Sequence, residues 1–296
     1  MLQDLDGLMQ REGIDALLAE GNGFETPDIY WLTGFLSPDT VICLHNRGEE
    51  TLVATGFNTL DRVLRESRIR RIYDLTDVYI GLIREGKRTA DEPERVYGPL
   101  LKEHFNGSVI GVPNHIPATV LVALQKMGYE VKVVPHLIEE ARATKSAEEI
   151  RAIRKAANAT IEAVSEIVEM IKNAEIGTKK ELVLDGEPLT VGRIKMALDH
   201  ILLDRRSESA EDAIVAVGKK GYDFHYLGKA RDRLRAGVPI IIDVFPRHKD
   251  LRYVADVTRT VVRGPVNDRL KSVFDAVKES ADAAVDALHD GAGIRA

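Results

Sequence analysis

The stretch IIIDVFPRHKDLRYVADVTRTVV, residues 240–262, carries an aspartate in each of two apolar runs that flank a charged turn. Pairing the two runs as antiparallel strands about Lys249–Asp250 puts Asp243 opposite Asp256, on one face and with Cβ atoms about 5 Å apart. Two carboxylates at that distance repel each other unless one takes up a proton or a cation lies between them. The hairpin therefore predicts a site for one or two divalent metal ions, with Asp243 and Asp256 as ligands.

A simpler interpretation is that both aspartates face solvent, one of them paired with Arg259. Strand alternation favours the metal site, because Ile241 shares the face of Asp243 and Thr258 shares that of Asp256, which makes a mixed face rather than a purely polar one. The prediction depends on the register, since a slip of one residue turns one aspartate to the other face.

The sequence around this hairpin predicts an antiparallel sheet with helices. Residues 144–173 form a long helical pattern that starts with a capping box at Ser146 and Glu149. Its apolar stripe is Ile150, Ile153, Ala157, Ile161, Val164 and Val168. The other predicted elements are helices at 190–205 and 267–288 and strands at 212–218, 238–245 and 253–262. His225 lies in the loop between the first two of these strands.

The first half of the chain alternates strand-like and helix-like segments. The predicted strands are residues 14–19, 40–44, 51–55, 108–113 and 130–135, and the predicted helices are residues 57–67 and 118–127. The charged stretch 84–98 reads as a solvated loop or the start of a helix. This alternation indicates an α/β domain. The change of pattern near residue 144 predicts two domains, residues 1–142 and 143–296.

The composition of the chain limits the classes of binding partner and the cellular compartment that we expect. The chain has 296 residues, 44% of them hydrophobic, and a net charge of -6. This charge gives no reason to expect nucleic acid or an anionic membrane as a partner. The N-terminus lacks the basic start and apolar core of a signal peptide, and no apolar run is long enough to span a membrane. We therefore expect a cytoplasmic protein in which Cys43, within the apolar run TVICL, is a buried and inert thiol.

Several segments together resemble the pita-bread metallopeptidases, the family of Xaa-Pro dipeptidases and aminopeptidases, methionine aminopeptidases and creatinases. The order of AIVAVG, His225, LRAGVPIIIDVF and YVADVTRTVVRG matches the family's strand, histidine loop, first aspartate strand and D-x-T-R-T strand. The segment TKSAEEIRAIRKAA resembles the K-x-x-E-E-I helix start of the same catalytic domain. DIYWLTGF, residues 28–35, resembles the YLTGF segment of the creatinase-type N-terminal domain.

The resemblance implies an α/β creatinase-like N-terminal domain at 1–142 and an α+β pita-bread catalytic domain at 143–296. It implies that Asp243 and Asp256 are the first two ligands of a dinuclear site, with Mn, Co, Fe or Zn as the candidate metals. It further implies that His225 lies beside the substrate and stabilises the developing tetrahedral centre.

Three departures from the family pattern concern this site. DVFPR replaces the usual D-x-G in a longer hairpin, and Phe224 precedes His225 where relatives often have proline. The family's remaining ligands, a histidine in a G-H-G-x-G context and two glutamates, have no counterpart before the final segment DGAGIRA. We therefore expect a catalytic domain truncated at its C-terminal end, with a degenerate family member as the alternative, and no activity from these 296 residues alone.

The leading functional hypothesis is a metal-dependent exopeptidase of the Xaa-Pro dipeptidase or aminopeptidase type. Its partners would be a peptide with proline after the scissile bond and a second copy in a homodimer. The alternatives are a creatinase-type amidinohydrolase, which uses no catalytic metal, and a non-catalytic binding module on the same fold. Retention of both aspartates favours the metal enzyme.

Overall fold

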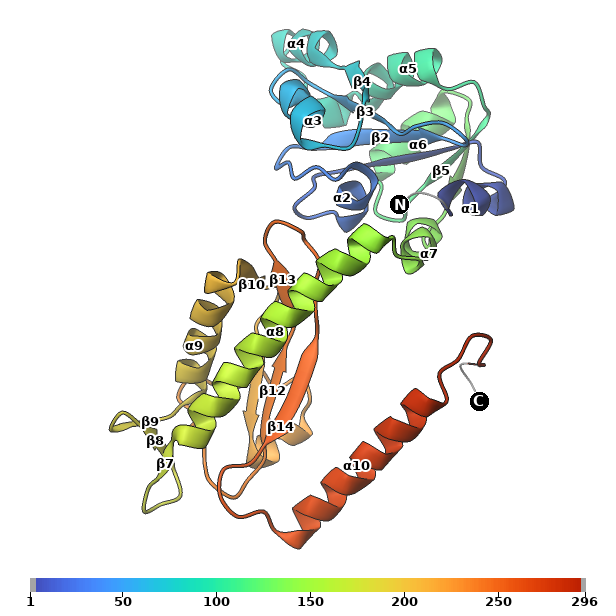
Figure 1. The fold of residues 1–296 in the computed structure, drawn as a ribbon. Coiled ribbons are helices and arrows are strands. Elements are labelled where there is room, and N and C mark those ends of the chain that lie inside the picture. The colour runs from blue at the N-terminus through green and yellow to red at the C-terminus, as the bar shows by residue number, and fades with distance from the viewer. Residues whose placement is uncertain (1–3, 294–296) are drawn as a thin grey trace. The chain divides into compact units, whose positions relative to one another are not determined.

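The chain divides into two compact units, Met1–Ser146 and Ala147–Ala296, and the computed structural model describes residues 4–293 of it (Figure 1). Each unit has its own hydrophobic core residues. Across residues 4–293, no helix combines the length and the apolar character that crossing a lipid bilayer requires.

The described part of the first unit is built on a six-stranded sheet in the order β4-β3-β2-β1-β5-β6. Its strands are β1 (Ala16–Gly21), β2 (Val41–Asn46), β3 (Leu52–Thr55), β4 (Arg71–Asp74), β5 (Val109–Val112) and β6 (Glu130–Val133). β1, β5 and β6 run parallel, as do β3 and β4, whereas β2 is antiparallel to both of its neighbours. The five predicted strands are confirmed to within a few residues, and β4 is an additional strand that the sequence pattern did not predict.

Helices cover both faces of this sheet. They are α1 (Leu5–Glu12), α2 (Pro27–Thr33), α3 (Leu60–Glu66), α4 (Thr76–Arg84), the 3₁₀ turn η1 (Thr89–Asp91), α5 (Pro93–His104), α6 (Ala118–Lys126) and α7 (Leu137–Ala143). Alternation along β1 sends Leu17 and Ala19 into a core with α1, α2 and α7, and Ala16 and Leu18 into a core with α5 and α6. This three-layer arrangement confirms the α/β prediction. Cys43 is buried in the first of these cores, where burial raises the pKa of its thiol to about 12, as expected for an inert cysteine.

The described part of the second unit packs helices against a three-stranded antiparallel sheet in the order β11-β12-β14. Figure 1 shows the long helix α8 crossing this sheet. The helices are α8 (Ala147–Asn173), α9 (Val191–Asp204) and α10 (Asp268–Asp286), and the 3₁₀ turn η2 spans Gly218–Tyr222. The three strands are β11 (Ile214–Val217), β12 (Ile240–Val244) and β14 (Val257–Val261). Smaller sheets pair β10 (Ser207–Ser209) with β13 (Pro246–His248), and β7 (Glu175–Ile176) and β9 (Glu187–Pro188) with β8 (Leu182–Leu184).

The buried face of α8 is rich in alanine. Ala152, Ala156 and Ala163 are buried, whereas Ile150 and Ile161 of the predicted stripe are 41% and 48% exposed. The helix itself is confirmed, but the predicted stripe was wrong at these two positions because it followed the largest apolar residues. Small side chains allow a helix to lie closer to its neighbour, so alanines can face the sheet while larger residues lie at the edge of the contact.

The faces of the β11-β12-β14 sheet differ in burial. Ile240, Ile242 and Val244 are buried in a core that also contains residues of α8 and α9. Ile241 and Asp243 alternate with them and are half-buried on the opposite face. This opposite face, which carries Ile241, Asp243 and Thr258, is called the aspartate face below.

Candidate metal centre

Asp243 lies within β12, on the aspartate face, at the point where β12 has a partner on both edges. Ile214 of β11 is its partner on one side and Thr258 of β14 on the other. The Thr258 hydroxyl donates a hydrogen bond of 2.6 Å to Asp243 Oδ1. Central placement restricts the backbone, and the threonine restricts the carboxylate, so Asp243 is held in one orientation.

The predicted register was wrong by two residues. Asp243 pairs with Thr258 and Val244 with Val257, so Asp256 is not directly opposite Asp243. Pairing continues on the other side of Asp256, where the Ala255 amide donates to the Pro246 carbonyl at 3.2 Å. Asp256 lies one residue before β14, and extending the period of two of the strand by that residue assigns Asp256 to the aspartate face. Asp256 is then a diagonal neighbour of Asp243, with an expected Cβ separation of about 7–8 Å.

The turn of the hairpin explains the register. The His248 amide donates to the Tyr253 carbonyl at 2.9 Å, which centres the turn on Asp250–Leu251, one residue later than predicted. The sequence assigned the residues between the two apolar runs to a charged turn, but the first of them, Pro246–His248, form the strand β13, which pairs with β10. A shift of one residue in the turn centre moves the pairing by two.

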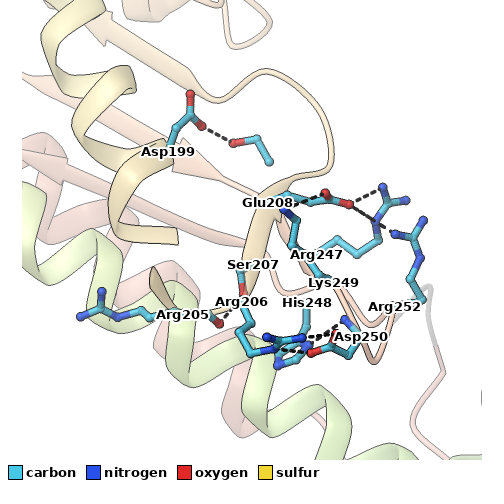
Figure 2. A network of polar contacts seen from close by, with 11 residues as sticks. Asp199, Arg205, Arg206, Ser207, Glu208, Arg247, His248, Lys249, Asp250 and Arg252 are labelled. Carbon is cyan, nitrogen blue, oxygen red and sulfur yellow. Dashed lines mark hydrogen bonds and ion pairs between the residues drawn. The ribbon is translucent and has the colours of Figure 1, made fainter. Parts of the chain in front are cut away.

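Ion pairs tie this hairpin to β10 (Figure 2). Arg206 donates two hydrogen bonds of 2.6 Å to the Asp250 carboxylate, and this bonding lowers the pKa of Asp250. Glu208 accepts from Arg247 at 2.9 Å and from Arg252 at 3.3 Å. Burial acts to raise the pKa of Glu208, but these basic partners outweigh it and the pKa lies below its usual value. The network fixes the position of the turn between the two aspartates.

His225 lies in an exposed loop beyond the outer edge of β11. Its amide donates to Asp223 Oδ1 at 3.1 Å, and its ring lies 4.6 Å from the ring of Phe224. The loop runs beside β11, because the Val215 amide donates to the Leu227 carbonyl at 3.2 Å. The structure therefore places His225 across β11 from Asp243, on the neighbouring connection.

Asp232 organises this histidine loop and was missed in the sequence. Its carboxylate accepts from the Tyr226 hydroxyl at 2.6 Å, from the Lys229 amide at 3.2 Å and from the Lys220 ammonium. Burial acts to raise the pKa of Asp232, but these donors outweigh it and bring the pKa to about 2. The surrounding letters GKARDRL carry no motif. A short polar residue in a loop was the sole available signal, and it is a weak one.

The aspartate face fits a divalent cation only in part. Two carboxylates from paired strands are hard oxygen ligands of the kind such ions bind. Within residues 4–293, however, no three histidine, cysteine, aspartate or glutamate side chains gather closely enough to hold a metal ion. The described residues thus offer two candidate ligands, fewer than the predicted dinuclear site needs.

Comparison with known families gives two matches that together cover most of the chain. Residues 1–144 match the creatinase/prolidase N-terminal domain, and residues 151–296 match metallopeptidase family M24. The chain belongs to metallopeptidase family M24. Its fold is accordingly a creatinase-type N-terminal domain followed by a pita-bread catalytic domain, as the sequence predicted.

Two curated relatives of this M24 chain are archaeal. A protein named Xaa-Pro dipeptidase from Pyrococcus horikoshii is 28% identical over 189 residues, which is 62% of this chain and 48% of the relative. A protein of the same name from Pyrococcus furiosus is 28% identical over 167 residues, 55% of this chain and 42% of the relative. The chain thus spans about half the length of the curated relatives it matches.

Solved structures share the fold over nearly the whole M24 chain. The prolidase from Pyrococcus horikoshii aligns with a TM-score of 0.70 at 21% identity, covering 96% of this chain and 71% of the other. The Xaa-Pro dipeptidase from Bacillus anthracis aligns with a TM-score of 0.72 at 18% identity, covering 94% and 68%. At this identity the likeness establishes the fold alone.

Proposed function

We propose that the protein carrying this chain is a metal-dependent exopeptidase that cleaves the bond before a proline. The observation that carries the proposal is the aspartate face, where Asp243 is bonded by Thr258 and strand periodicity assigns Asp256 to the same side. Membership of family M24 and the name Xaa-Pro dipeptidase of both curated relatives support it. They favour a peptidase over the amidinohydrolase and the binding module.

Asp243 and Asp256 are the proposed metal ligands. A bound divalent ion polarises a carbonyl and makes a water molecule acidic enough to supply hydroxide near neutral pH. Thr258 holds Asp243 by donating to Oδ1, which leaves the other carboxylate oxygen for the metal. We propose that the site binds two divalent ions, with Mn, Co, Fe and Zn as the candidates. Further ligands are needed beyond Asp243 and Asp256, because the described residues gather no third one beside them.

We assign His225 to the stabilisation of the tetrahedral centre formed on the scissile carbonyl. A protonated ring nitrogen can donate to the oxygen on which negative charge develops. His225 is exposed, and Asp232 bonds the segment just after it through Tyr226 and Lys229, so the loop is anchored while the imidazole is free to meet a substrate.

The domain boundary, the oligomeric state and the cellular compartment are also proposals. We propose that the functional domains are residues 1–142 and 143–296. The junction of the compact units at 146 and 147 and the gap between the family matches at 144 and 151 support a boundary close to this point. A cytoplasmic homodimer is proposed on the family resemblance.

Substitution of the ligands tests the proposed function in the full-length protein. Asp243→Asn and Asp256→Asn should each lower kcat/KM for an Xaa-Pro dipeptide by more than about 100-fold and reduce the bound metal, because loss of a second-shell partner alone typically costs 10–100-fold. Thr258→Val should fall between these variants and the wild type. Asp185→Asn is the matched control, since Asp185 is exposed in the turn between β8 and β9.

Metal content and dipeptide turnover are measured on the same samples. Near-normal turnover in Asp243→Asn, or equal losses in Asp185→Asn, would remove the aspartate face from the proposed site.

A further inference from the structure

In the sheet of the first unit, the connections that follow two neighbouring strands leave in opposite directions, and the proposed peptidase chemistry does not use this position. β1 and β5 are parallel neighbours, but their onward connections diverge. After β1 the chain passes through α2 to β2 on one side, and after β5 it passes through α6 to β6 on the other. In open α/β sheets, ligands bind outside the carboxyl ends of two strands at such a divergence.

Glu20 stands at this position, near the end of β1. Strand alternation puts it on the same face as Ala16 and Leu18, where it continues a row that is otherwise apolar. The Tyr97 hydroxyl donates to Glu20 Oε2. Burial raises the pKa of Glu20, and this effect exceeds the opposing contributions of the Tyr97 hydrogen bond and the nearby His115. The carboxylate is therefore poorly compensated when it is charged.

Two cavities meet at Glu20. A narrow one of about 220 Å³ has mostly apolar and aromatic walls, including Tyr79, Pro93, Val96 and Tyr97. A wider one of about 550 Å³ is lined by polar residues, including Asp28, His115 and Arg142. Glu20, Thr40 and Pro117 line both. A molecule in the narrow cavity would present an apolar body to the walls and one end to the Glu20 carboxylate.

Charge pairing distinguishes Glu20 from Asp28, a second carboxylate that lines the wider cavity. Asp28 accepts from Arg142 at 2.9 Å and has His115 at 4.0 Å, so it has cationic partners within the unit. Among the described residues, Glu20 has an uncharged hydroxyl as its one hydrogen-bond donor. His115 is the nearest cationic group that acts on Glu20, and it also lies 4.0 Å from Asp28. A positively charged group in the narrow cavity would give Glu20 an ion-pair partner of its own.

We propose that the first unit binds a small organic ammonium ion, namely a protonated primary amine with an apolar body. The apolar body would occupy the narrow cavity and the ammonium group would pair with the Glu20 carboxylate. The site is separate from the aspartate face and does not depend on the proposed peptidase function. A purely structural role for Glu20, as a polar cap at the end of the core that is satisfied by Tyr97, predicts no preference for amines.

The test uses 3-methylbutylamine and its uncharged counterpart 3-methylbutan-1-ol as probes. Both are titrated into the 296-residue chain by ligand-observed NMR at pH 8, where the amine is protonated. We expect saturable amine binding in the millimolar range and at least tenfold weaker binding of the alcohol. Amine affinity should fall as the pH is lowered and Glu20 takes up a proton.

Glu20→Gln is the deciding variant, because the amide oxygen can still accept from Tyr97 while the charge is lost. It should weaken amine binding at least tenfold and leave the alcohol unchanged. Glu130→Gln, which removes an exposed carboxylate from β6, should bind the amine like the wild type. Equal binding of amine and alcohol, unchanged affinity in Glu20→Gln, or no saturable amine binding by the wild type would overturn the proposal. The pH series on the wild type keeps the test valid if the variant unfolds.

Discussion

β1 of the first unit is buried on both sides, whereas β12 of the second unit is buried on one side and half-exposed on the other. In β1 the residues of both alternating sets lie in hydrophobic cores, and the polar Glu20 appears only near the end of the strand. In β12 the polar Asp243 lies inside the strand, between two buried neighbours. Both strands alternate, but the layers around them differ.

The difference indicates where each sheet can support chemistry. A sheet covered on both faces leaves room for polar groups only at the ends of its strands, because a buried charge needs compensation. A sheet covered on one face can carry a row of ligands along a strand, with the helices behind it holding the backbone. The Glu20 cavity and the aspartate face follow these two patterns.

The largest expected effect comes from placing a carboxylate inside each strand. Leu18→Asp should lower the unfolding free energy by about 3–5 kcal/mol, because it buries an unpaired charge in β1. Ile241→Asp should cost only about 1 kcal/mol, because its side chain lies on the half-exposed aspartate face. Urea unfolding followed by hydrogen exchange of each strand measures both. Similar losses in the two variants would break the comparison.

A smaller effect distinguishes the two units by the sign of their pH dependence. The lowered pKa of Glu208 means that its stabilising contribution is present above the unfolded value near 4.3 and is lost as the pH falls through the folded value. The raised pKa of Glu20 means the opposite: its contribution is present below about 4.3 and is lost as the pH rises through the folded value.

Charge-removing variants reveal these opposite slopes. As the pH falls, β10 and β13 should lose protection from hydrogen exchange, and Glu208→Gln should reduce that loss by about 0.5–1 kcal/mol. The effect is small because the Glu208 side chain is 34% exposed and its ion pairs are screened. Glu20→Gln should flatten the loss toward neutral pH in the first unit, which the fluorescence of Trp31, the one tryptophan of the sequence, reports. The same sign in both units would contradict the assigned causes.

Most of the fold could be predicted from the sequence, because alternation and helical spacing are local properties. The aspartate face was predicted correctly in its β12 part, since a period of two assigns Ile241 and Asp243 to one side whatever the register. The register was not predictable, because the turn is positioned by Arg206 and Glu208, about 40 residues earlier in the chain. Glu20 gave no signal, since its partner Tyr97 comes from another segment, and Asp232 gave only the weak signal of a short polar residue in a loop.

The most direct test of the central claim is to locate a bound ion on the 296-residue chain by paramagnetic broadening with Mn²⁺. Two carboxylates without further ligands should bind weakly, in the millimolar range, because affinity follows ligand number and preorganisation. The claim predicts that amide signals at residues 241–243 and 256–258 broaden first, that Asp243→Asn removes the effect, and that Asp185→Asn does not. Broadening centred elsewhere, for example around Glu20 and Asp28, or broadening that persists unchanged in Asp243→Asn, would contradict the assignment of the metal to the aspartate face.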